Sequence, residues 1–279
     1  MQICTYLADQ GPRVGVVANG QVIDAGFDGS MIDLISQWPQ VRGRIEAAVA
    51  AGSGKPLGQV QLLAPVPRPG KVFAIGLNYA DHIEESRMET PEHQVWFTKA
   101  VTSVTGPYAP VQIPKVSAFV DYEAELVAVI GKGGKHIPAE KAAEHIFGYA
   151  VGNDVTERFW QHRTAQWSLG KSFDTHAPFG PWITTTDAVA DVHALGIRCL
   201  VNGQERQNSN TRHLVFDIFQ QIEHLSQAMT LEPGDVIFTG TPGGIGAAMI
   251  PRQFLKAGDV VRCEIDGLGH IENTLAPEA

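Results

Sequence analysis

Two glutamates lie one residue apart at the start of an apolar run, because Glu123 and Glu125 directly precede the segment Leu126–Ile130. On a β-strand, side chains two residues apart share a face, so this spacing places both carboxylates together. Ionised carboxylates entering a buried strand are costly unless a positive charge neutralises them. Divalent cations such as Mg²⁺ prefer oxygen ligands. The pair therefore indicates either a metal site or two surface glutamates at the entrance of a strand.

A third carboxylate follows another predicted strand. Residues Ile146–Val151 read as a strand that leads into Gly152-Asn153-Asp154. At the end of this strand, Asp154 is a candidate for the third carboxylate of a metal site. The alternative is an aspartate that caps a helix or forms a turn, since both positions favour this residue.

An imidazole and a carboxylate are spaced for contact in the predicted helical segment Leu77–Ser86. His82 and Glu85 are three residues apart, so their side chains are neighbours on one helix face. A carboxylate can orient an imidazole and raise its basicity, which is what a general base requires. A helix-surface ion pair is the alternative interpretation.

Gly170-Lys171-Ser172 resembles the end of a phosphate-binding loop, but the glycine expected five residues earlier is Ala165. We therefore reject a nucleotide-binding P-loop. Lys171 is interpreted as a residue that reaches an anionic ligand, or as a solvated loop lysine. The glycines that flank Thr241 permit close backbone approach to a ligand, and its hydroxyl is a candidate contact.

Composition excludes several classes of protein. The chain has 279 residues, 44% hydrophobic, with a formal net charge of −9 and no basic run. We therefore expect no nucleic-acid partner. Three widely spaced cysteines indicate neither a disulfide framework nor a zinc–thiolate site. No apolar run approaches the roughly 20 residues that span a bilayer, and the first residues do not resemble a signal peptide. We expect a cytoplasmic protein without membrane contact.

The elements predict a mixed α+β fold that is mainly β. Residues 1–65 are interpreted as a small α/β domain, in which Asn19-Gly20 predicts a hairpin turn, and residues 66–279 as the main domain. Main-domain strands are expected at Lys71–Gly76, Val120–Lys132, Ile146–Val151, Ile197–Val201, Val236–Phe238, Val260–Ile265 and Ile271–Leu275. Beyond Leu77–Ser86, helices are expected at Pro138–His145 and at Leu214–Ala228, the second with a core stripe of Phe216, Phe219, Ile222 and Leu225.

Five short motifs occur in order along the chain: Gly76-x-Asn78-Tyr79-x-x-His82-x-x-Glu85, Asp121-Tyr122-Glu123-x-Glu125-Leu126, Asn153-Asp154-Val155-Thr156-x-Arg158, Gly170-Lys171-Ser172-x-Asp174 and Thr239-Gly240-Thr241-Pro242-Gly243-Gly244. Together they closely resemble the fumarylacetoacetate hydrolase family over about residues 60–275. Gln161 and Gln166-Trp167 are most similar to its bacterial branch of acylpyruvate and diketo-deoxy sugar-acid hydrolases. Phe159 stands where many members have an aspartate, so the substrate is left open.

The resemblance implies a β-roll catalytic domain, a homodimer and one Mg²⁺ or Mn²⁺ ion, with Ca²⁺ as a further candidate. It implies that Glu123, Glu125 and Asp154 bind the metal and that His82 and Glu85 form a catalytic dyad on a lid. Substrate-binding roles carry over to Arg158, Gln161, Lys171 and Thr241, and Lys171 also has a catalytic role.

The expected reaction is hydrolysis of a C–C bond in a 2,4-diketo acid such as an acylpyruvate. The metal would act as Lewis acid on the small anionic 2-oxo acid end, and water activated by His82 would attack the distal carbonyl. Cleavage then leaves a metal-bound pyruvate enolate. The same site could run decarboxylation, isomerisation or hydration, and a non-catalytic binding protein is the alternative from another class. The distal half of the substrate is expected near the residues after Glu85 and near Trp160, Trp167 and Phe173.

Overall fold

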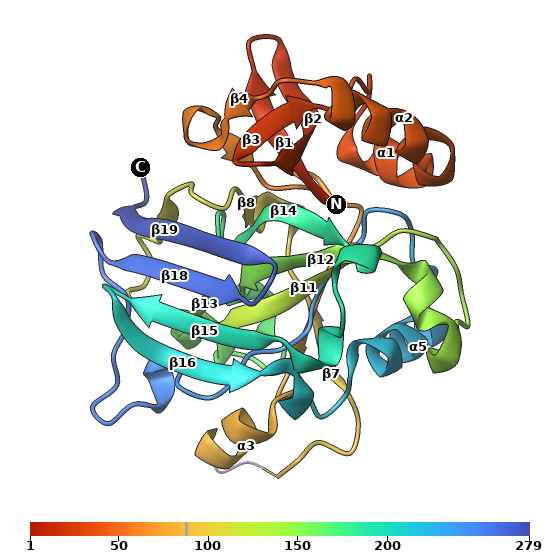
Figure 1. Ribbon diagram of the computed structural model, residues 1–279. Coiled ribbons are helices and arrows are strands. Elements are labelled where there is room, and N and C mark those ends of the chain that lie inside the picture. The colour runs from red at the N-terminus through yellow and green to blue at the C-terminus, as the bar shows by residue number, and fades with distance from the viewer. Residues whose placement is uncertain (87–88) are drawn as a thin grey trace.

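The computed structural model describes residues 1–86 and 89–279 (Figure 1). Within these residues the larger sheet has twelve strands: β4 (Lys55–Pro56), β3 (Gln21–Asp24), β2 (Gly11–Ala18), β1 (Gln2–Ala8), β14 (Ala177–Thr185), β12 (Ile146–Asn153), β11 (Ala124–Ile130), β17 (Val236–Phe238), β6 (Val72–Gly76) and β7 (Val95–Thr98) in spatial order, with β5 (Leu62–Leu63) on β1 and β8 (Val104–Thr105) on β14. Because β1 pairs with β14, the N-terminal strands continue the main sheet.

A second sheet lies beside β11 and β12 (Figure 1). Its order is β16 (Gln204–Asn210), β15 (Gly196–Val201), β18 (Val260–Ile265), β19 (Gly269–Pro277) and β9 (Val111–Ile113). A short pair of β10 (Val120–Asp121) and β13 (Thr156–Glu157) stands apart from both sheets. The mainly β, mixed α+β class expected from the sequence is therefore confirmed.

The helices are α1 (Met31–Ser36), α2 (Trp38–Ala51), α3 (Ala80–Ser86), α4 (Arg158–Gln161) and α5 (Ile218–Ala228). Short 3₁₀ segments are Leu57–Gln59, Val101–Ser103, Ala139–His145, Trp167–Leu169, Thr186–Ala188, Val192–Ala194, Thr211–His213 and Gly246–Ala248. No helix in the described ranges is long and apolar enough to cross a membrane.

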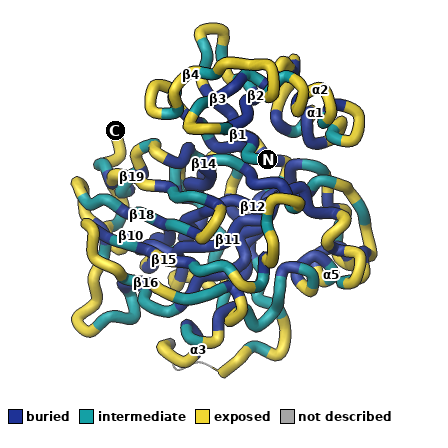
Figure 2. The backbone as a smooth tube through the Cα atoms, in the orientation of Figure 1, coloured by how far each residue is buried: buried dark blue, intermediate teal, exposed yellow. Residues whose placement is uncertain are grey.

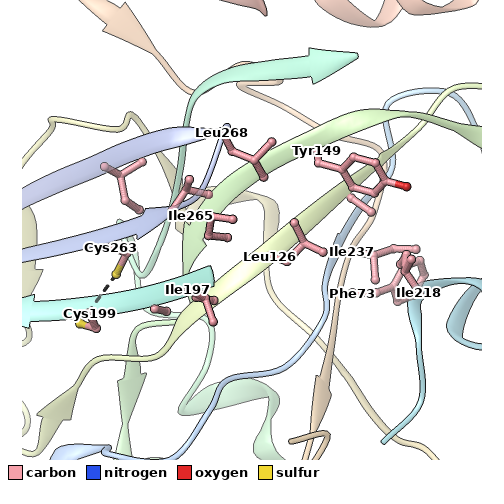
Figure 3. Packing of buried hydrophobic residues seen from close by; sticks show 14 of the residues in the cluster. Phe73, Leu126, Tyr149, Ile197, Cys199, Ile218, Ile237, Cys263, Ile265 and Leu268 are labelled. Carbon is pink, nitrogen blue, oxygen red and sulfur yellow. Dashed lines mark hydrogen bonds between the residues drawn. The ribbon is translucent and has the colours of Figure 1, made fainter. Parts of the chain in front are cut away.

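Strand β11 is buried along its whole length (Figure 2). Its two faces enter different cores. Leu126 packs with Ile197 and Ile265 of the second sheet (Figure 3). Ala128 belongs to the same cluster. Val127, on the other face, belongs to the cluster that includes the N-terminal helices. The sequence expectation of a strand apolar on both faces is thus confirmed, and this rigid strand carries Glu125.

Three predicted elements need correction. The strand expected over Val120–Lys132 is interrupted at Tyr122-Glu123 and ends at Ile130. The helix expected over Leu214–Ala228 begins only at Ile218, because Asp217 caps it by accepting hydrogen bonds from the Phe219 and Gln220 N–H groups. Ile222 and Leu225 are buried as expected, and Phe219 is partly buried against the same core, whereas Phe216 precedes the helix and was wrongly placed in the stripe. The third helix, expected over Pro138–His145, is a 3₁₀ segment.

The division into residues 1–65 and 66–279 stays a prediction. The N-terminal hairpin at Asn19-Gly20 is present, with both residues at positive φ, as a two-residue turn of this kind requires. Its strands and α1 and α2 form the upper part of the molecule in Figure 1.

Candidate active site

Three carboxylates converge at the ends of β11 and β12. Oxygen atoms of Glu123, Glu125 and Asp154 all lie within 4.8 Å of one another, and the three residues are buried. The antiparallel pairing places Ala124 opposite Asn153, and the Asp154 N–H donates to the Glu123 carbonyl at 2.8 Å. The three carboxylates that the sequence marks as candidates therefore lie together. Glu123 lies in the interruption before β11, where its N–H donates to the Asn153 side chain rather than to a backbone carbonyl of a neighbouring strand.

Two of these carboxylates are surrounded by buried cations. Lys171 Nζ lies 2.6 Å from Glu123 Oε2 and 2.7 Å from Asp154 Oδ2. Arg158 Nη1 lies 2.7 Å from Glu123 Oε1. Burial acts to raise the pKa of Glu123, but Lys171 and Arg158 hold that pKa at about 2. Burial likewise opposes the charge on Lys171, but Asp154 and Glu123 raise the pKa of Lys171 above its usual value. Lys171 is thus a buried ammonium ion rather than a solvated loop lysine.

Glu125 has a different environment. Its Oε2 accepts a hydrogen bond from the Gly240 N–H at 2.8 Å, at a position where φ is +104° and glycine is favoured. No cationic side chain of the described residues forms an ion pair with it. Burial, together with the charges of Asp154 and Glu123, raises the pKa of Glu125 well above its usual value. Negative charge is therefore in excess at this side of the cluster.

This donor set fits a hard divalent cation. Carboxylate oxygens are the preferred ligands of Mg²⁺, Mn²⁺ and Ca²⁺, and the three carboxylates are close enough to share one ion. A dication would also offset the repulsion that raises the pKa of Glu125. Glu123, Glu125 and Asp154 are thus the residues that would hold the metal.

The imidazole of His82 and the carboxylate of Glu85 face each other on α3. His82 Nδ1 lies 3.7 Å from Glu85 Oε2, and it makes no hydrogen bond to the part of the chain that the structure describes. Glu85 also accepts the Gly244 N–H at 2.9 Å. Burial acts to raise the pKa of Glu85, but His82 and this N–H bring it below its usual value. An ionised Glu85 carboxylate therefore faces the imidazole of His82, where it can orient the ring.

One cavity of about 250 Å³ brings most of the predicted site residues together. Its lining includes His82, Glu123, Glu125, Arg158, Gln161, Lys171, Thr241 and Trp167. Gln161 accepts from Arg158 Nη1 at 3.0 Å, while the Thr241 hydroxyl donates to the Ala124 carbonyl at 3.0 Å. Of the aromatic residues expected around the distal half of the substrate, Trp167 lines the cavity, whereas Trp160 packs on Phe173 away from the lining. The segment expected after Glu85 includes residues 87–88, which lie outside the described residues.

Three residues at the site were missed by the sequence reasoning. Lys99, directly after β7, is fully buried with its Nζ 2.5 Å from Asp154 Oδ1. Asp121 accepts from Arg158 Nε at 2.9 Å, and Gln207 accepts the Ala124 N–H at 2.9 Å. Lys99 had a sequence signal, since it is the single charged residue between Gln94 and Pro114. Asp121 lies in a quoted motif, but only the fold brings it to Arg158.

We expect Lys99→Met to lower the free energy of unfolding by about 3 kcal/mol, because it removes one partner of a buried ion pair. Urea unfolding with and without added Mg²⁺ measures this. Lys141→Met is a matched control, since the exposed Lys141–Glu144 pair contributes little. Equal effects of the two substitutions would contradict the importance of Lys99.

Comparison with known proteins agrees with this geometry. The family model described as fumarylacetoacetate (FAA) hydrolase C-terminal matches residues 71–276. A mitochondrial oxaloacetate tautomerase of Rattus norvegicus is 43% identical over 272 residues, covering 94% of this chain and 87% of the relative. Among solved structures, a maleylpyruvate hydrolase from Sphingobium sp. SYK-6, in complex with manganese(II) and pyruvate, is 35% identical with a TM-score of 0.86. A 5-carboxymethyl-2-hydroxymuconate delta-isomerase from Mycobacterium smegmatis is 35% identical with a TM-score of 0.83. Both alignments cover 100% of this chain and 100% of the compared chain.

The matched residues contain every element of the carboxylate cluster and of the His82–Glu85 pair. The relatives include both isomerases and a hydrolase, so the comparison supports an enzyme without fixing its reaction. The match spans most of the chain. The protein therefore belongs to the fumarylacetoacetate hydrolase family.

Proposed function

We propose that this protein interconverts the enol and keto forms of a 2-oxo diacid of the oxaloacetate type, with a divalent metal in the carboxylate cluster. The observation that carries the proposal is that His82, Glu123 and Glu125 line one cavity. The imidazole of His82 thus lies in the same cavity as the carboxylates that would bind a cation. Similarity to the rat oxaloacetate tautomerase over 94% of the chain favours proton transfer over bond cleavage.

Conversion of the enol to the keto form requires only the transfer of protons between the 2-hydroxyl oxygen and carbon 3. The enol loses the proton of its 2-hydroxyl group, and carbon 3 gains one, so charge and atoms balance. A divalent ion held by Glu123, Glu125 and Asp154 would supply positive charge that stabilises the anionic 2-oxo acid end.

His82 is the group proposed to deliver the proton to carbon 3 and to remove it in the reverse direction. Its Nδ1 faces Glu85, so Nε2, on the opposite edge of the ring, is the atom proposed to exchange the proton with substrate. Glu85 would stabilise the charged imidazolium. Lys171 and Arg158 keep Glu123 ionised, as its pKa of about 2 indicates.

Gln161 is proposed to bind the substrate's 2-oxo acid end. Its amide oxygen accepts from Arg158, which leaves the NH₂ group as the donor. Thr241 is proposed to shape the same wall, because its hydroxyl proton already serves the Ala124 carbonyl.

The test follows the enol of oxaloacetate, whose conjugated C=C bond absorbs ultraviolet light that the keto form does not absorb. Protein with Mg²⁺, Mn²⁺ or Ca²⁺ should speed the loss of this absorbance, and a chelator should abolish the effect. The three metals compared in one assay also address which ion the cluster prefers. No acceleration with any of them would refute the tautomerase proposal.

Hydrolysis of a C–C bond in a 2,4-diketo acid is the second candidate. The similarity to a maleylpyruvate hydrolase solved with manganese(II) and pyruvate favours it. Here His82 would activate water for attack on the distal carbonyl. Pyruvate release from acylpyruvates, diketo sugar acids or maleylpyruvate, measured beside the enol assay, distinguishes the two reactions; loss of carbon dioxide from oxaloacetate would identify a decarboxylase.

Two further expectations accompany the proposal. A homodimer is expected from family resemblance, and sedimentation equilibrium measures it directly. A cytoplasmic location is expected from the sequence, whereas the rat relative is named as mitochondrial, so location in cells is tested by fractionation.

A further inference from the structure

Most positive charge in the active-site cavity is already bound to protein carboxylates. Lys171 contacts Glu123 and Asp154, and Arg158 contacts Glu123 and Asp121. These cations hold the inner end of the cavity together. A substrate with a second carboxylate would need a different partner for it.

His162 occupies a different part of the same cavity wall. It directly follows α4, where its N–H donates to the Arg158 carbonyl at 3.2 Å, so its backbone position is fixed. The side chain lines the cavity together with Gln161 and Lys171, although the residue as a whole is exposed. It therefore lies at the mouth, where a substrate would extend away from the carboxylate cluster.

The surroundings of His162 favour negative charge. Burial lowers the pKa of His162, and the charges of Arg158, Arg252 and Lys171 lower it further. The three charges that lower this pKa are all positive, although Asp121 and Glu123 partly neutralise Arg158 and Lys171. The same field that opposes an imidazolium would stabilise a carboxylate next to the ring.

We propose that His162 is a specificity-determining residue that donates a hydrogen bond to the distal carboxylate of a 2-oxo diacid. The inference rests on the proposed function, because it needs the 2-oxo acid end at the inner carboxylate cluster. It deepens that function by selecting diacids over 2-oxo acids with an uncharged tail. Gln161 then faces the inner end and His162 the outer end of one substrate.

The test compares two four-carbon ligands that differ in the distal group. Oxaloacetate carries a second carboxylate, and 2-oxobutanoate carries a methyl group there. Binding to Mg²⁺-loaded protein is followed by tryptophan fluorescence, to which Trp167 in the cavity wall contributes. A hydrogen bond to a charged group at a partly exposed site predicts about a tenfold preference for oxaloacetate. His162→Leu should remove this preference by lowering the affinity for oxaloacetate and leaving the affinity for 2-oxobutanoate unchanged.

Arg163→Leu is the matched control, since it removes a neighbouring charge that stacks on Trp160, 4.8 Å from its ring centre, rather than lining the cavity. This variant should keep the preference. His162→Gln, which retains an N–H donor, should keep part of the preference for oxaloacetate. His162→Glu should lower the affinity for oxaloacetate more than the affinity for 2-oxobutanoate. Equal binding of both ligands to the unmodified protein would overturn the inference alone. Binding of neither would overturn the proposed function with it.

Discussion

His82→Ala should lower the rate of enol–keto conversion by roughly 10²–10⁴-fold, the usual contribution of a positioned acid–base group. The affinity for Mn²⁺ should stay nearly unchanged, because His82 is not one of the three carboxylate residues that converge on the cation site. Turnover and metal titration on the same preparation measure both quantities. The combination matters, since a collapsed site would lose both.

Glu85→Gln is the companion variant. It keeps the shape of the side chain but removes the charge that faces His82 at 3.7 Å, so we expect a smaller loss of rate than for His82→Ala. His224→Ala is a control, because His224 lies exposed on α5. If His82→Ala retains the rate within about threefold, well below an acid–base contribution, His82 is not the proton donor and the mechanism must be reassigned.

The sequence predicts the structure best where the signals lie within a few neighbouring residues. Asn19-Gly20 forms the expected turn, with both residues at positive φ, since a two-residue hairpin depends on nothing distant. The apolar run after Glu125 is buried on both faces, as its composition indicates. The Asp217 cap was also a local signal and could have placed the start of α5 correctly.

Contacts between residues far apart in the chain could not be predicted in the same way. The interruption before β11 depends on Asn153 and Gln207, which bind the N–H groups of Glu123 and Ala124. A periodic apolar pattern carries no information about such partners. The adjacency of Lys99 and Asp154 likewise exists only after β7 and β12 have joined one sheet. Motif order pointed to the family, but the fold alone reveals the charge balance.

Glu125→Gln should remove most of the affinity for a divalent metal, and we expect the dissociation constant to rise about 100-fold, at the upper end of effects seen even for residues behind the metal ligands. At a metal concentration 100 times the original dissociation constant, the unmodified protein gains about 2.7 kcal/mol of stability. The variant would then gain only about 0.4 kcal/mol. Thermal unfolding with and without Mg²⁺ measures this difference.

Without metal, the same substitution should have the opposite effect on stability. The raised pKa of Glu125 means that the folded chain holds this proton more tightly than the unfolded chain. Its contribution is therefore present below the unfolded pKa of about 4.3 and is lost as pH rises through the folded pKa. In chelator-treated protein at neutral pH, Glu125→Gln should equal or exceed the unmodified protein in stability, because a neutral amide replaces a buried charge.

Opposite signs in the two conditions separate a metal ligand from a structural glutamate. Glu144→Gln, at an exposed residue paired with Lys141, should change neither measurement. A glutamate needed only for packing would lose stability in both conditions when replaced. A variant that binds Mg²⁺ as tightly as the unmodified protein would remove Glu125 from the metal site, and Glu123 and Asp154 would then be left with Lys171 as their shared cation. Because Lys171, Arg158 and Lys99 together already neutralise those two carboxylates, the case for a dication depends on Glu125 more than on either of the others.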